Sequence, residues 1–87
     1  MITILIRLLI THPNPAKDYF IASYNTHGST KMQLQIFDMN SRLIQTHQLV
    51  GKDQLVIDIR DLPAGVYMVN LIEGKTFVES HKLTIVN

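Results

Sequence analysis

A chain of 87 residues holds one domain and is too short for two. With 46% hydrophobic and 17% charged residues, it is too apolar for a disordered segment, so we expect a packed core. Eight basic and seven acidic residues leave a formal charge of +1 without a basic run, so nucleic acid or an anionic membrane gains little electrostatic attraction. The absence of cysteine excludes disulfides, Cys-type zinc sites and thiol nucleophiles.

The first segment, residues 1–10, is strongly apolar. It lacks a basic start and a small-residue cleavage site, so we interpret it as a first β-strand in preference to a signal peptide. It is also too short to cross a bilayer as a helix, and we expect no transmembrane segment. The turn His12-Pro13-Asn14-Pro15 ends it, because proline lacks a backbone donor and fixes its neighbours in extended or turn geometry. We expect a single domain over residues 1–87, with residues 1–10 as its first strand or a leading remnant.

Short apolar runs separated by turn residues fill the rest of the chain, at a spacing of roughly ten residues that is typical of all-β folds. Together with residues 1–10, they predict about seven strands in an immunoglobulin-like antiparallel β-sandwich. The further strands are expected at residues 19–24, 32–38, 43–49, 55–59, 66–72 and 76–86. Alternation with period two predicts these inward side chains: Met32, Leu34, Ile36, Leu55, Ile57, Ile59, Tyr67, Val69 and Leu71.

Three local features are predicted within these strands and turns. Asn40 can tolerate the positive φ that the hairpin turn after Asp38 needs. A bulge is expected near Ser80 and His81 in the last strand. The sequence Leu62-Pro63-x-Gly65-x-Tyr67 is typical of a tyrosine corner, in which a tyrosine hydroxyl bonds to the backbone a few residues upstream; the alternative is that Tyr67 only packs in the core.

Catalytic and metal-binding chemistry finds little support. The histidines do not pair at metal-ligand spacing, and the carboxylates lie at strand ends or turns, where they accept backbone hydrogen bonds. The chain has no Gly-x-Ser-x-Gly and no glycine-rich phosphate loop. We therefore expect a protein that is not an enzyme, with no catalytic residue, no metal site and no cofactor. The histidines are His12, His27, His47 and His81, and the carboxylates are Asp18, Asp38, Asp53, Asp58, Asp61, Glu73 and Glu79.

The closing segment, residues 82–87, is apolar, β-prone and terminal. A terminal strand at a sheet edge can pair with another chain by strand addition or with a second copy of itself. It can equally do no more than complete its own sheet, and the sequence leaves both interpretations open.

Four segments, taken together and in order, resemble a known family. They are Pro13-Asn14-Pro15-Ala16-x-Asp18, Ile36-Phe37-Asp38-Met39-Asn40-x-Arg42-Leu43, Asp61-Leu62-Pro63-Ala64-Gly65-Val66-Tyr67 and a closing Lys82-Leu83 strand. The set resembles a type A C-terminal sorting domain of the type IX (Por) secretion system of Bacteroidetes, over about residues 9 to 87.

The resemblance implies an immunoglobulin-like sandwich at the C-terminus of a larger secreted protein. Such a domain directs cargo from the periplasm through an outer-membrane translocon to the cell surface or beyond. Its partners would be shuttle and translocon proteins and a sortase-like enzyme that removes it, and cargo is often left on anionic lipopolysaccharide. The recognition residues carried over are Pro13, Asn14, Pro15, Asp18, Asn40, Arg42, Leu62, Pro63, Gly65, Tyr67, Lys82 and Leu83.

The chain departs from the family pattern at three places. Ser41 stands where glycine is usual, which predicts a different or strained hairpin turn. Thr84 lengthens the closing strand by one residue, which would reverse the facing of the residues after it. The chain begins at Met1 without an upstream cargo, so an excised piece, a truncated reading frame and a stand-alone domain remain open.

The alternative to a sorting domain is an immunoglobulin-like adhesion or carbohydrate-binding accessory module. Such a module needs a flat or concave face with exposed aromatic rings, and we expect at most two or three of the six aromatic side chains to point outward. A structural spacer is a third interpretation.

Overall fold

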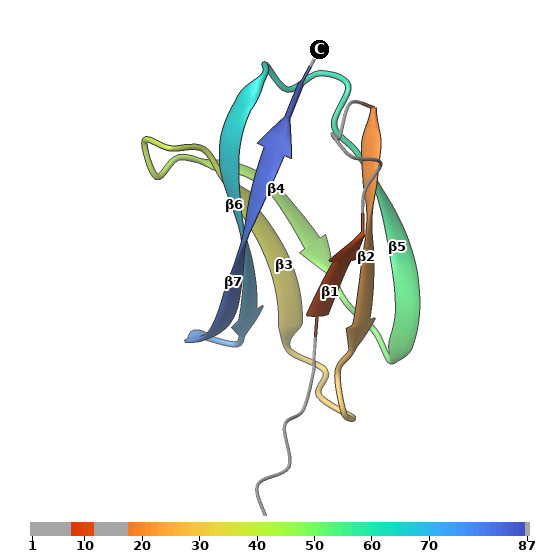
Figure 1. Cartoon of the computed structure of the whole chain (residues 1–87). Helices are drawn as coiled ribbons and strands as arrows, with labels where there is room; N and C mark the ends of the chain where they lie inside the picture. Colours follow the sequence, from red (N-terminus) through yellow and green to blue (C-terminus); the bar gives the residue numbers. More distant parts are fainter. Residues whose placement is uncertain (1–7, 12–17, 87) are drawn as a thin grey trace, which may run out of the picture.

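The computed structural model describes residues 8–11 and 18–86, and these form seven strands and no helix (Figure 1). The all-β prediction is confirmed. The strands are β1 (Leu8–Thr11), β2 (Tyr19–Asn25), β3 (Met32–Phe37), β4 (Leu43–Gln48), β5 (Lys52–Asp58), β6 (Gly65–Glu73) and β7 (Thr76–Ile85).

The strands form two sheets that face each other as an immunoglobulin-like sandwich (Figure 1). One sheet has three strands in the order β1-β2-β5, and the other has four in the order β4-β3-β6-β7. Every pairing between neighbours is antiparallel. The last strand, β7, therefore lies at an edge of the four-stranded sheet, as the closing segment of the sequence suggested.

Alternating side chains from both sheets make the core, because successive residues of a strand point to opposite faces. In β3, Met32, Leu34 and Ile36 are buried, while the residues between them are half-buried on the outer face. The predicted inward sets are confirmed, with Leu55 only partly buried at the margin of the core. The buried apolar residues are Phe20, Ala22, Met32, Leu34, Ile36, Leu49, Ile57, Ile59, Tyr67, Val69, Leu71, Leu83 and Ile85.

The bulge of the last strand lies earlier than predicted. Leu71 pairs with Glu79 and Ile72 pairs with Phe77, so Val78 is the extra residue, whereas Ser80 and His81 pair regularly with β6. The prediction near Ser80 was wrong because the sequence does not show where two strands lose register. After the bulge the alternation is regular, with Leu83 and Ile85 buried and Thr84 exposed.

The first and last strands place the two ends of the fold at opposite ends of the sandwich. Leu8 at the start of β1 pairs with Tyr24 near the end of β2, beside the β2–β3 loop. Ile85 at the end of β7 pairs with Gly65 at the start of β6. Figure 1 shows β1 beginning low in the view and β7 ending at the top.

Candidate recognition surface

Three of the signature segments meet at one end of the sandwich. The hairpin of residues 38–42 follows β3, the connection of residues 59–64 leads into β6, and β7 finishes beside them. The three-stranded sheet joins there through Asp18, whose carbonyl accepts a hydrogen bond of 2.9 Å from the N–H of Ile59. We call this region the signature end, defined by Asp18, residues 38–42, residues 58–65 and the end of β7.

The β3–β4 hairpin is held by the carboxylate of Asp38. Its Oδ1 accepts hydrogen bonds from the backbone N–H groups of Asn40 (2.8 Å) and Arg42 (3.0 Å), and its Oδ2 accepts one from Nε of Arg42 (3.0 Å). These bonds favour the charged carboxylate, so the backbone N–H of Arg42 first, and then its side chain and Asn40, lower the pKa of Asp38. The tip of the turn is thereby fixed, with Met39 and Asn40 exposed.

The positive φ of this hairpin falls on Ser41, at 63°, and not on Asn40. The prediction that Asn40 would carry it was wrong, because Asn40 is held by the Asp38 carboxylate one position before the left-handed residue. Ser41 thus adopts a left-handed conformation that glycine adopts more easily, because a side chain at positive φ crowds the backbone; that this turn is strained stays a prediction.

Arg60 and Asp58 form the second ion pair of this end. Nη2 of Arg60 lies 2.8 Å from Oδ2 of Asp58, Nε lies 3.1 Å from Oδ1, and the backbone N–H of Arg60 donates to Oδ1 at 2.9 Å. The guanidinium and then the backbone bond lower the pKa of Asp58 to about 2. Together with Asp18, Tyr19 and Val56, the pair lines a shallow hollow. Both partners of the pair are exposed, so the arrangement orders the surface more than it stabilises the fold.

The predicted tyrosine corner is confirmed. Tyr67 is buried, and its hydroxyl donates a 2.7 Å hydrogen bond to the carbonyl of Pro63, four residues upstream. Gly65 has a φ of 153°, which side chains rarely adopt, so glycine permits the bend between the two residues. The bond ties the connection of residues 59–64 to the core and gives the signature end a fixed shape.

The recognition residues expected from the sequence fall into two groups. Those on the surface are Asp18, Asn40, Arg42, Pro63, Gly65 and Lys82. Tyr67 and Leu83 are buried and Leu62 is half-buried, so these three hold the fold. Pro13, Asn14 and Pro15 lie outside the described residues.

Sequence reasoning left three ordering residues out of the recognition set. Asp38, Asp58 and Arg60 hold the turns of the signature end through their hydrogen bonds. Of the three, only Asp38 has a position, directly before a turn, from which the sequence could have predicted this role. An aspartate that opens a turn often accepts backbone N–H bonds two or more residues on. The pairing of Asp58 with Arg60 across two residues at a strand end has no comparable sequence signal.

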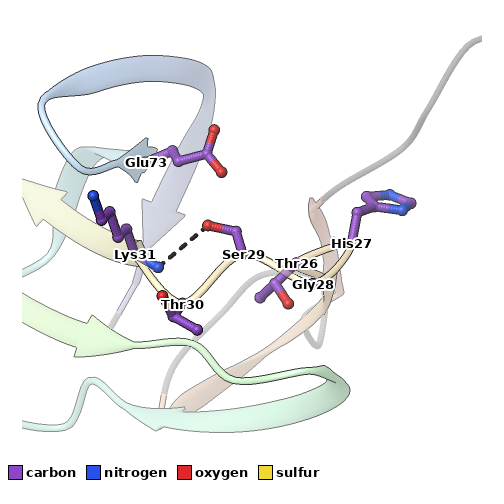
Figure 2. Close-up of a pocket in the computed structure, with 7 residues that line it drawn as sticks. All are labelled: Thr26, His27, Gly28, Ser29, Thr30, Lys31 and Glu73. Atoms are coloured by element: carbon purple, nitrogen blue, oxygen red, sulfur yellow. Dashed lines mark hydrogen bonds between the residues drawn. The ribbon is translucent and has the colours of Figure 1, made fainter.

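A second hollow lies at the opposite end of the sandwich (Figure 2). It is lined by residues 26–31 and Glu73. The hydrogen bonds among its lining residues hold the turn itself: Ser29 N–H donates to the Thr26 carbonyl at 3.0 Å and Lys31 N–H to Oγ of Ser29 at 3.2 Å. His27 and Gly28 both have positive φ, as a tight turn of the primed type requires. We therefore interpret this hollow as a consequence of the turn geometry and not as a binding site.

Within the described parts of the chain, residues 8–11 and 18–86, no group of three or more metal-ligating side chains comes together. The same residues contain no helix with the length and apolar character needed to span a membrane.

The comparison with curated proteins finds no match. The model of the family described as secretion system C-terminal sorting domain matches residues 11–86, nearly the whole chain. The chain therefore belongs to the C-terminal sorting domains of the type IX secretion system, a family of cargo tags for proteins exported to the cell surface or the extracellular space.

Proposed function

We propose that the sandwich directs an attached cargo protein through an outer-membrane translocon by presenting its signature end to a shuttle or translocon protein. The observation that carries this is the gathering of exposed signature residues at one end. Asp18 precedes β2, whereas Asn40 and Arg42 lie in the β3–β4 hairpin, and the topology brings these two segments to the end where β7 finishes. The buried signature residues then serve to hold this surface.

The direction of the chain supports the proposal. The first described residue, Leu8 at the start of β1, lies at the end of the sandwich with the β2–β3 loop, opposite the signature end. A cargo joined there would leave the signature end accessible to a receptor. A sortase-like enzyme would then cut upstream of β1, where removal of the domain leaves the cargo intact. The domain itself acts as an address and not as an enzyme.

The edge of β7 offers a second way for partners to dock. Glu79 and His81 point to the inner face, because they pair with the buried residues Leu71 and Val69, and their side chains are 3.1 Å apart. Inward polar groups and a bulge protect an edge strand from unwanted pairing. The bulge at Val78 and this pair guard the first part of β7, which leaves residues 82–85, beside the signature end, for strand addition by a partner or a second copy.

The test fuses the full chain, residues 1–87, which includes β1, to a periplasmic reporter in a bacterium that carries this secretion system. Export of the reporter is expected, and its retention inside the cell would count against the proposal. A double variant Asn40→Ala with Arg42→Ala should cut export while the domain stays folded. Lys75→Ala, exposed in the β6–β7 turn at the opposite end, is the matched control and should leave export unchanged.

A further inference from the structure

The outer face of the four-stranded sheet carries rows of uncharged polar side chains. Gln35 pairs with Thr46 on one side and Asn70 on the other, and Asn70 pairs with Ser80, so one row crosses all four strands. In the next row Gln33 pairs with Gln48. We call these six residues, Gln33, Gln35, Thr46, Gln48, Asn70 and Ser80, the neutral face. All are half-buried or exposed, and none bears a formal charge.

The amides of the neutral face are partly engaged with one another. Nε2 of Gln35 donates to Oε1 of Gln33 at 3.4 Å, and Nε2 of Gln33 donates to Oε1 of Gln48 at 3.5 Å, which are long and weak bonds. Oγ of Ser80 donates to Oδ1 of Asn70 at 2.8 Å. A primary amide has two N–H donors and two lone pairs on its oxygen, so these bonds leave donors and acceptors on the face for a ligand.

Apolar side chains border the neutral face at both of its ends. Ile72 pairs with Gln33 and with Phe77, so these two apolar side chains complete the Gln33 row, and the ring of Phe77 is 58% exposed. On the other side, Phe37 pairs with Met68 and Leu43, and the exposed Lys82 pairs with Met68 in the same row. An aromatic ring beside aligned amides offers a stacking surface next to hydrogen-bonding groups. With the exposed Tyr19 of β2, three aromatic side chains point outward, which agrees with the two or three expected from the sequence.

This chemistry selects among partners. The six side chains of the neutral face have no charge to pair with an ion, and Lys82, in the neighbouring row, is the charge that lies beside them. An apolar protein surface would remove water from six polar side chains without replacing their hydrogen bonds, which is unfavourable. A neutral saccharide matches both parts, since its hydroxyls bond to amides and its C–H faces stack on aromatic rings. We propose that the neutral face binds a neutral glycan chain, independently of sorting.

Affinity gel electrophoresis with dextran, mannan and xylan tests this, followed by calorimetry with oligosaccharides of whichever polysaccharide retards the chain. At least one of the three should retard it, equally at about 50 mM and about 500 mM NaCl, because screening does not affect a neutral ligand. Asn70→Ala and Gln33→Ala should each weaken binding about tenfold, which corresponds to about 1.4 kcal/mol. The matched control is Gln54→Ala, an exposed amide on β5 of the other sheet, which should bind as the unaltered chain does.

Urea unfolding of each variant confirms that the sandwich is intact. The proposal is overturned if none of the three polysaccharides retards the chain, if Asn70→Ala and Gln54→Ala bind alike, or if binding falls with salt. Self-association that Asn70→Ala abolishes would assign the face to a second copy and would also overturn it.

Discussion

Replacing Tyr67 with phenylalanine measures what the tyrosine corner contributes. The substitution keeps the buried ring and removes only the hydroxyl that donates to the Pro63 carbonyl at 2.7 Å, so it opens no cavity. One neutral hydrogen bond contributes about 0.5–1.5 kcal/mol net. Because Pro63 is exposed, water can replace the lost donor at its carbonyl, so we expect a loss of about 1 kcal/mol. In a domain of this size that lowers the melting temperature by roughly 4–8 °C.

Urea unfolding followed by circular dichroism gives the free energy of unfolding for Tyr67→Phe and for Tyr19→Phe, an exposed tyrosine on β2. The control should change by less than about 0.5 kcal/mol, as surface substitutions usually do. The slope of free energy against urea should be the same in both, because the surface buried on folding is unchanged. If Tyr67→Phe is as stable as the control, the hydroxyl bond to Pro63 does not stabilise the fold, and the role given to the tyrosine corner is refuted.

Three further substitutions separate the fold, the turn and the charges of the signature end. Leu83→Ala should lower the free energy of unfolding in urea by about 2–5 kcal/mol, because it leaves a cavity at a fully buried position. The neighbouring Lys82 is exposed, and Lys82→Ala should lower it by less than about 0.5 kcal/mol. Equal losses would contradict the division into buried and surface signature residues. Ser41→Gly should raise the free energy of unfolding by about 0.5 kcal/mol. Relief of a left-handed strain of about 1–2 kcal/mol exceeds the cost of the added freedom of glycine in the unfolded chain. A less stable variant would show that the turn carries no strain. The pKa of Asp58 in the folded chain is about 2, below that of an unfolded aspartate, so its contribution to stability is complete above about pH 4 and disappears as the pH falls toward about 2. Asp58→Asn should therefore lose less stability than the unaltered chain between about pH 5 and about pH 2, and parallel losses in urea unfolding would show that Arg60 does not hold this carboxylate.

Period-two alternation explains why so much of the fold could be predicted. In β3 and β6 the inward residues were predicted correctly because burial of one sheet face imposes that period directly on the sequence. The tyrosine corner was predicted for a similar reason, since a proline, a glycine and a tyrosine at fixed spacing act within one short segment.

What the sequence could not show depends on contacts between segments. The bulge at Val78 depends on the pairing of β6 with β7, and the sequence of β7, which predicted a bulge, did not show its position. The left-handed residue at Ser41 depends on how the Asp38 carboxylate binds the hairpin. The division of the signature residues into surface and core also depends on the facing of each strand, since the adjacent Lys82 and Leu83 lie on opposite sides of β7.

The opposite placement of the first and last strands has a mechanical consequence. Tension applied between the polypeptide before β1 and the tail after β7 runs along the strands and not across them. Backbone hydrogen bonds between antiparallel strands lie perpendicular to the strands, so this load would shear many of them at once instead of opening them one after another. A domain pulled forward by its tail while a cargo drags behind would resist unravelling along the direction in which it is drawn.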